Sequence, residues 1–323
     1  MNKFYLLFLL YCSLFVTACM KSTTVEEMFA VVDKSIQFFP DSSFFSDIRH
    51  IKYEDGYLYM LDVKRRNVVR LNLSLTEMKE YGTGGRGPGE LQAPFSFSIR
   101  GDTVSILDFM SRSLKQYSST GYINEVNLDV IPNDGRIDMT LDNDFLVPLL
   151  SDTYQFSIVS KDGCRSLGCP QHFKTIKKTT VYNHNHVLHY KDKIVVVPST
   201  LPYAQVYDKK GCFLKIIDLN KTQFYKKNLS YIASQANFSK DNVSYVLNVD
   251  AYIVDDILYV LCSRFGNTYM SDRILAVDLN KCDVKKVILL PDANYGSICS
   301  DGSRFYVFNA DNTSLDILME KNS

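Results

Sequence analysis

The residues best suited to chemistry are three histidines in the segment HNHVLH, namely His184, His186 and His189. Imidazole binds metals and exchanges protons near neutral pH. Side chains on a β-strand alternate between its faces, so His184 and His186 would share a face and His189 would point to the other. No acidic cluster adjoins them, and the DND run at 142–144 lacks the glycine and distal glutamate of a calcium loop. We therefore predict no metal site and no cofactor.

Carboxylates near the ends of expected strands form a second candidate set. Two carboxyl groups that face each other at about 5–10 Å could act as acid and base on a glycan. Nothing in the spacing of these residues separates them from ordinary turn residues, and neither a G-x-S-x-G motif nor a Ser-His-Asp order is present. We assign no catalytic residue. The candidates are Asp47, Glu90, Asp138 and Asp250.

Polar residues near the beginnings of expected inner strands form a third set. If those strands surround one axis, their first side chains approach it together and create a polar binding funnel. Two further candidates lie in a glycine-rich connection, where they could instead pair with each other or with a neighbour. The predicted funnel residues are Arg49, His50, Arg86, Glu90, His186 and Asp250.

A repeated strand pattern must position these side chains. The segment GYLYMLDVKRRNVVRLNL (56–73) contains two apolar-alternating strands joined by a charged turn. Similar units recur six times, and each has an inner strand, an Asp- or Gly-containing turn, an apolar strand and a third strand. Four antiparallel strands every ~40–50 residues are typical of a β-propeller blade. The sequence predicts an all-β fold, a six-bladed β-propeller of four-stranded antiparallel blades.

Two segments stand outside the repeats. The sixth unit is one strand short, and Lys34–Phe39 precedes the first unit without a partner, so we predict that this segment closes the ring; the alternative is a loose tether. Between the fourth and fifth units, Thr222–Ser239 has apolar residues at helical spacing. We expect one inserted helix there, which covers apolar blade surface or acts as a lid.

The glycine-rich run GTGGRGPGELQAP (82–94) connects the first two units. Together with the blade pattern and the N-terminal segment described below, it resembles the TolB-like and NHL-like six-bladed propeller lipoproteins, which carry a GxGxGPGEF…P run at this place. The resemblance implies a fold and a location more than an activity. Glycines permit sharp turns and close approach, and proline restricts φ. The matching structural positions are Gly84, Gly87, Pro88, Gly89 and Pro94.

The N-terminus has the features of an export signal. Lys3 precedes an apolar run from Phe4 to Val16, which is shorter than a membrane span of ~20 residues, and VTAC follows at 16–19. This resembles a bacterial lipobox with Cys19 as the lipidated residue. An ordinary signal peptide or an anchor helix are the alternatives. We predict a signal peptide at 1–18, a lipid-anchored tether at 19–31 and a propeller domain at 32–323.

Composition excludes one class of partner. The chain has 36 basic and 36 acidic residues, so it lacks the basic excess of a nucleic-acid-binding protein. The 21 Tyr and 20 Phe residues suit strands. Six cysteines follow Cys19, and Cys164 and Cys169 flank a short turn in which they could be bridged or remain free thiols.

These observations predict a lipid-anchored scaffold or binding module of the cell envelope. We expect it on the outer membrane, held through Cys19, with a protein or glycan partner and no nucleic acid. An envelope glycan hydrolase or lyase, with acid and base carboxylates in the funnel, is the alternative.

Overall fold

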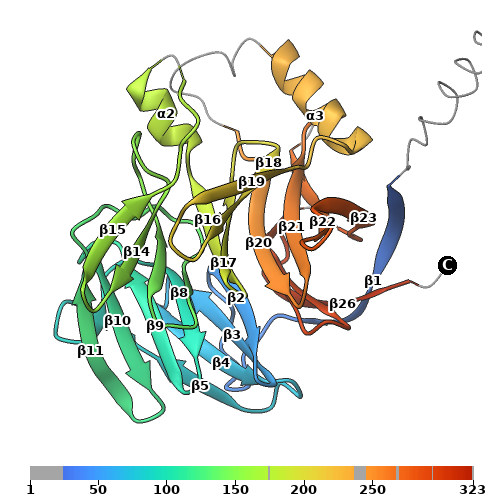
Figure 1. The fold of residues 1–323 in the computed structure, drawn as a ribbon. Coiled ribbons are helices and arrows are strands. Elements are labelled where there is room, and N and C mark those ends of the chain that lie inside the picture. The colour runs from blue at the N-terminus through green and yellow to red at the C-terminus, as the bar shows by residue number, and fades with distance from the viewer. Residues whose placement is uncertain (1–24, 174, 236–244, 267–268, 293, 322–323) are drawn as a thin grey trace, which may run out of the picture.

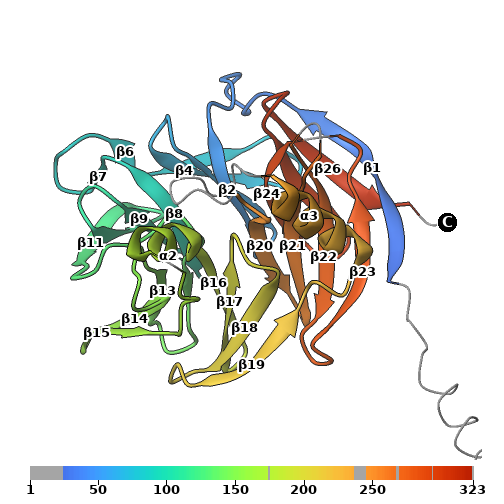
Figure 2. The same ribbon diagram turned by 90° about the horizontal axis from the view of Figure 1, so that it is seen from above.

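Six antiparallel blades surround one axis (Figures 1 and 2). The computed structural model describes residues 25–173, 175–235, 245–266, 269–292 and 294–321. The predicted signal peptide and Cys19 lie outside this range. In the described part of the chain no helix has the length and apolar character needed to cross a membrane.

The first four blades are separate four-stranded sheets. Blade 1 contains β2 (Ile48–Glu54), β3 (Tyr57–Asp62), β4 (Asn67–Asn72) and β5 (Met78–Tyr81). Blade 2 contains β8 (Pro94–Arg100), β9 (Thr103–Asp108), β10 (Ser113–Ser118) and β11 (Gly121–Asn127). Blade 3 contains β12 (Asp138–Met139), β13 (Phe145–Pro148), β14 (Phe156–Ser160) and β15 (Gly163–Leu167). Blade 4 contains β16 (Asn185–Tyr190), β17 (Lys193–Pro198), β18 (Tyr203–Asp208) and β19 (Phe213–Asp218).

Blades 5 and 6 are joined into one eight-stranded sheet by the N-terminal strand β1 (Glu26–Ile36). Blade 5 contains β20 (Asn248–Val254), β21 (Ile257–Arg264), β22 (Met270–Asp278) and β23 (Asp283–Leu289). Blade 6 contains β24 (Tyr295–Ser300), β25 (Phe305–Asn309) and β26 (Ser314–Glu320).

Strand β1 confirms the predicted closure of the ring but differs from it in extent. Ser35 pairs with Asp316 and Ile36 with Leu315 in an antiparallel ladder with β26. The strand begins at Glu26, eight residues before the predicted start, because Glu26–Phe29 also pairs with β23 in a parallel ladder. Residues 26–31, predicted as tether, therefore belong to the sheet, and Gln37–Phe39 lie beyond the strand.

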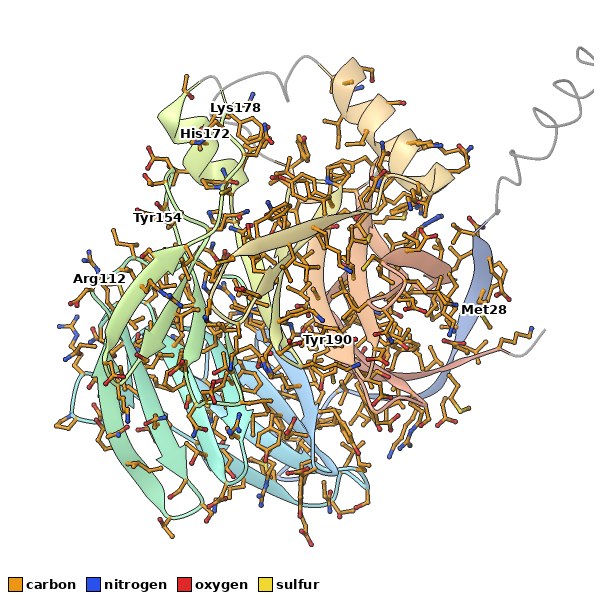
Figure 3. The ribbon with its side chains drawn as sticks, in the orientation of Figure 1. Met28, Arg112, Tyr154, His172, Lys178 and Tyr190 are labelled. Carbon is orange, nitrogen blue, oxygen red and sulfur yellow. The ribbon has the colours of Figure 1, made fainter. Side chains whose placement is uncertain are left out.

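The inner hairpin of every blade turns where the sequence predicted. The turns carry residues in the left-handed region at Gly56, Gly101, Asn143, Lys191, Asp255 and Gly302, with φ between 52° and 89°. Glycine, Asn and Asp adopt this conformation most readily. Six buried apolar clusters then fill the ring, one between each pair of neighbouring blades. Figure 3 shows how side chains occupy these spaces.

Two helices lie on one face of the ring (Figures 1 and 2). Helix α3 (Gln223–Ser234) is the predicted insertion between blades 4 and 5, and it packs Phe224, Tyr225 and Ile232 against the cluster between these blades. Helix α2 (Ile176–Tyr182) was not predicted, because its threonines and β-branched residues have low helix propensity. Each helix precedes the inner strand of the next blade.

Candidate functional site

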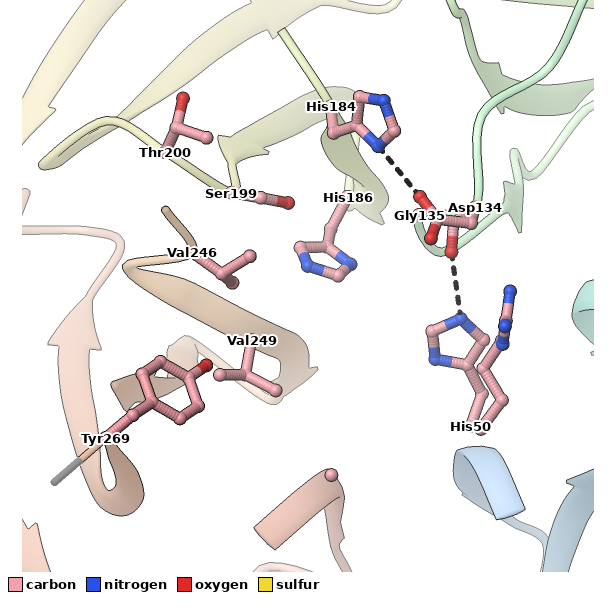
Figure 4. Close-up of a pocket in the computed structure, with 12 residues that line it drawn as sticks. His50, Asp134, Gly135, His184, His186, Ser199, Thr200, Val246, Val249 and Tyr269 are labelled. Carbon is pink, nitrogen blue, oxygen red and sulfur yellow. Dashed lines mark hydrogen bonds and ion pairs between the residues drawn. The ribbon is translucent and has the colours of Figure 1, made fainter. Parts of the chain in front are cut away.

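A pocket of about 360 Å³ opens near the ring axis (Figure 4). Four of the six blades contribute to it, mainly through the beginnings of their inner strands and the connections beside them. It is lined by Arg49, His50, Asp134, Gly135, His184, His186, Ser199, Thr200, Val246, Val249, Tyr269 and Gly296. Thr200 donates a hydrogen bond to the carbonyl of Tyr182, the last residue of α2, which places the pocket on the face that carries the helices.

Bulges in the inner strands aim these side chains. The pairing of β2, β20 and β24 shifts register at Arg49, Val249 and Gly296, and all three shifted residues line the pocket. A bulge bends its strand and redirects the side chains around it. The inner strand of blade 2 has the same shift at Phe95, whose ring lies 4.8 Å beneath the guanidinium of Arg49.

The floor below the pocket is a buried ion pair between Arg136 and Asp250, both fully inaccessible to solvent. Nε and Nη2 of Arg136 donate to the two carboxylate oxygens of Asp250 at 2.5 and 2.6 Å. The guanidinium also donates to the carbonyls of Ile51 and Ile298, at 2.9 and 2.8 Å. Ser297 Oγ donates to Asp250 at 2.6 Å. Blades 1, 3, 5 and 6 are thereby joined at the axis.

This pair is charged in the folded protein. Burial alone would raise the pKa of Asp250, but the adjacent Arg136 guanidinium outweighs it and holds the pKa well below the usual range. For Arg136 the same attraction outweighs burial and raises the pKa. A bidentate, fully hydrogen-bonded pair is the arrangement in which buried charges are tolerated. Asp250 is therefore part of the frame and is not free to act as an acid or base.

A second contact, between His184 and Asp134, lies in the wall of the pocket. Nδ1 of His184 lies 2.9 Å from Oδ1 of Asp134, and this bond lowers the pKa of the Asp134 carboxyl well below its ordinary value. Nε2 of His50 faces the carbonyl oxygen of Asp134 at 3.4 Å (Figure 4). Gly135 is required here, since a Cβ would lie 1.7 Å from the carbonyl oxygen of Asn185.

Three buried nitrogen atoms of pocket-lining residues have no hydrogen-bond partner among the described residues: Nη1 of Arg49, Nδ1 of His50 and Nε2 of His186. Nδ1 of His50 lies 3.7 Å from Oδ1 of Asp250, below the pocket. The backbone N–H of Arg136 donates to Nδ1 of His186 at 3.3 Å, so a neutral ring must carry its proton on Nε2. Burial lowers the pKa of His186 to about 4, and the ring is neutral at pH 7. His186 is 4% exposed, and Figure 4 shows its ring between His50 and Val246.

The opposite end of the axis is filled. Lys52 Nζ lies 3.3 Å from Asp138 Oδ1 and donates to the carbonyl of Ile137 at 3.1 Å. The backbone N–H of His189 donates to the other oxygen of Asp138 at 2.9 Å. Desolvation lowers the pKa of Lys52, which the Asp138 carboxylate partly offsets. A cavity of about 110 Å³ remains beside this pair.

The structure brings together four of the six predicted funnel residues. Arg49, His50 and His186 line the pocket, and Asp250 lies in its floor. The predicted division of the histidines also holds, because His184 and His186 face the pocket while His189 lies at the other end. No group of three or more metal-binding side chains suited to an ion occurs among the described residues.

Arg86 and Glu90 do not line the pocket. The glycine-rich connection crosses blade 2 near its outer strands: Tyr117 donates to the carbonyl of Gly89 at 2.9 Å, and a Cβ on Gly89 would lie 2.6 Å from Tyr122. Glu90 accepts the backbone N–H of Gly87 at 2.6 Å. These contacts hold the glycine-rich connection, and with it Arg86 and Glu90, away from the axis.

The other predicted positions in the connection serve its geometry. Gly84 lies in β6 (Thr83–Gly84), which pairs with β7 (Glu90–Leu91). Pro88 is exposed in the intervening turn, and Pro94 begins β8. Separately, Cys164 and Cys169 are exposed and not joined. Cys164 lies in the strand β15, and Cys169 follows two residues after the strand ends.

The pocket does not meet the requirement for two facing carboxylates. Among the described residues, Asp134 is the only acid that lines it. Asp138 lies at the opposite end and Asp250 is held by Arg136. Sequence reasoning missed Arg136, Asp134 and Tyr269. A signal for Arg136 was present, because it begins the third repeat just as His50 begins the first.

A family model described as a 6-bladed beta-propeller, DUF5128, matches residues 39–261. The chain belongs to this family. No curated protein matches the DUF5128 chain at a significant level.

Several solved structures are similar to this DUF5128 chain. A Bacteroides fragilis protein described as exported superposes with a TM-score of 0.62 at 13% identity, covering 92% of this chain and 99% of that one. A DUF4221 family member from Bacteroides vulgatus gives a TM-score of 0.62 at 11% identity, covering 93% and 99%. Virginiamycin B lyase from Staphylococcus aureus gives 0.53 at 12% identity, covering 90% and 99%. At these identities the similarity shows the fold alone.

Proposed function

We propose that this protein is an exported binding module that receives part of a protein or glycan partner in the axial pocket. The observation that carries the proposal is that two buried groups in the wall of an open pocket, Nη1 of Arg49 and Nε2 of His186, are unsatisfied. The third unpaired nitrogen, Nδ1 of His50, lies 3.7 Å from the Asp250 carboxylate instead. Leaving a buried polar group unpaired costs about 1–3 kcal/mol, and a ligand acceptor removes that cost. Rigid blades position the groups, as a preformed site requires.

Export and anchoring are the second part of the proposal. The apolar segment before Cys19 and the resemblance to TolB-like and NHL-like lipoproteins support a lipid anchor on the outer membrane. A structural neighbour described as exported is consistent with this location. Incorporation of labelled palmitate into the wild-type protein, and its loss in Cys19→Ala, is the expected result. Equal labelling of the two proteins would contradict lipidation at Cys19.

Binding through the pocket face can be tested by site-specific photo-crosslinking in native membranes. A photoreactive residue at Tyr269, which lines the pocket and is 50% exposed, should form adducts. The matched control is Phe213 in β19, which is 49% exposed on the outer edge of blade 4 and should form few. Mass spectrometry identifies the adducts. Equal yields at the two positions, or none at Tyr269, would overturn the proposal.

A further inference from the structure

Nη1 of Arg49 and Nε2 of His186 restrict the chemistry of a ligand, whereas the unpaired Nδ1 of His50 faces Asp250. A neutral imidazole with its proton on Nε2 and a guanidinium both donate hydrogen bonds, and neither can accept one at these atoms. They therefore cannot satisfy each other. Both require an acceptor supplied from outside, and the open pocket is the place from which it can come.

The charges around the pocket narrow the choice further. Arg49 makes no ion pair within 4.0 Å among the described residues, while the Asp134 carboxylate is already paired with His184. Burial lowers the pKa values of both His50 and His186, so neither ring adds a positive charge to the pocket at pH 7. Asp134 partly balances the Arg49 charge, since the bond to His184 and then the Arg49 charge both lower the pKa of the Asp134 carboxyl. Because Asp134 repels an anion in proportion to its charge, a monoanion is favoured over a phosphate dianion at this site.

We propose that the axial pocket binds a single carboxylate, which accepts hydrogen bonds from Arg49 and from Nε2 of His186. This inference rests on the proposed function and names the group that is recognised. Arginine recognises carboxylates through two parallel bonds, and its stacking on Phe95 keeps the guanidinium plane in place.

The rest of the pocket accommodates what is attached to the carboxylate. Val246 and Val249 form an apolar wall, and Ser199 and Thr200 lie nearby (Figure 4). Ser263 donates to the hydroxyl oxygen of Tyr269 at 2.7 Å, which leaves the Tyr269 proton free to donate. A volume of about 360 Å³ admits more than a bare ion. The same carboxylate chemistry could come from a small free acid or from the C-terminus of a peptide.

Calorimetric titration of the full mature chain distinguishes these sources. The probes are acetate, propionate, acetyl-alanyl-alanine with a free carboxylate, the same peptide as its C-terminal amide, and inorganic phosphate. Binding of the peptide acid, with the amide at least about tenfold weaker, is expected. If acetate and propionate bind as tightly as the peptide acid, the ligand is a small free acid. If they bind more weakly than the peptide acid, the ligand is the C-terminus of a peptide.

Variants locate the binding. Arg49→Gln should weaken the peptide acid at least about tenfold, because the charge is lost while no intramolecular hydrogen bond is broken. His186→Asn keeps an acceptor near Nδ1 for the Arg136 N–H and removes the Nε2 donor, so it should weaken binding as well. Arg86→Gln removes an exposed arginine outside the pocket and should bind as the wild type does.

Three results would overturn the inference: equal affinity for acid and amide, phosphate binding tighter than the carboxylates, or no carboxylate binding up to about 10 mM, which corresponds to only ~3 kcal/mol. An Arg49→Gln protein that binds like the wild type would do the same. Crosslinking at Tyr269 without carboxylate binding would reject this inference while leaving the proposed function intact. Absence of crosslinking at Tyr269 would reject the proposed function itself.

Discussion

Two arginines near the ring axis differ in how completely their guanidinium groups are paired: Arg136 is fully buried, while Arg49 is half-buried with an inaccessible Nη1. Arg136 donates to a carboxylate, a hydroxyl and two carbonyls, while Arg49 stacks on Phe95 and leaves Nη1 unpaired. The first arrangement is complete without a ligand and joins blades together. The second is incomplete and faces an open pocket. The comparison teaches that hydrogen-bond satisfaction separates framework residues from recognition residues, even where both are charged and close to the axis.

The largest effect on stability is expected from disrupting the Arg136–Asp250 ion pair. Arg136→Met leaves Asp250 charged and buried without its main partner, and we expect the free energy of unfolding to fall by about 3–5 kcal/mol. The double variant Arg136→Met/Asp250→Leu should recover part of this loss, because no charge is then stranded. Urea denaturation followed by circular dichroism measures both, since the chain has no Trp. A loss below about 1 kcal/mol in the single variant would contradict the conclusion that Arg136 is a framework residue.

The next largest effect is a pH dependence centred on His186. Its pKa falls from 6.5 to about 4 on folding, so between these values the unfolded chain binds the extra proton. The contribution of this group to stability is therefore complete above pH 6.5. As the pH falls toward 4, the free energy of unfolding decreases by roughly 3 kcal/mol through this group. His50 contributes in the same direction. His186→Asn should flatten the stability curve across this window, and curves parallel to the wild type would contradict the assignment.

A smaller effect is expected at the filled end of the axis. Lys52→Met keeps the apolar stem but removes the partner of Asp138, which retains the N–H of His189 and is partly exposed. We expect a loss of about 1–2 kcal/mol in the free energy of unfolding. The matched control is Lys221→Met, where Lys221 and Asp283 form a surface pair about half exposed on each side. That change should cost less than about 0.5 kcal/mol, and equal losses would argue against burial as the cause.

The smallest effect on stability is expected for Arg49→Gln. The side chain makes no hydrogen bond within the described part of the chain but loses its contact with the Phe95 ring, so the free energy of unfolding should fall by about 0.5–1 kcal/mol. The same urea titrations measure it. A loss comparable to that of Arg136→Met would show that Arg49 is a framework residue and would remove the main support for a ligand at this position.

The fold was predictable because its signals are local. Alternating apolar residues define the strands, and turn residues with positive φ recur at the inner hairpin of each blade. The missing strand of the sixth unit correctly indicated closure by the N-terminus. The length of β1 was not predictable, since Glu26–Val31 lacks a regular apolar alternation and is stabilised by two ladders from distant segments.

The site was predictable only in part. His50, His186 and Asp250 could be selected because they lie near the starts of expected strands. Arg136 was missed although it begins the third repeat, because its pairing with Asp250, 114 residues away, is set by the assembled ring and leaves no local pattern. Tyr269 enters from a connection within blade 5 whose position depends on tertiary packing. Which buried donors remain unpaired is a property of the assembled ring.

Strand β1 also determines where the N-terminal segment joins the ring. It is the outermost strand of blade 6, and Figure 1 shows it at the side of the molecule, with Glu27 near its beginning beside helix α3. Any attachment through the chain before Glu26 therefore joins the propeller at its circumference, at the junction between blades 5 and 6. An attachment at this position lies at the rim of the ring, and no residue of β1 lines the axial pocket, so the strand that joins the ring to its support is not part of the pocket mouth.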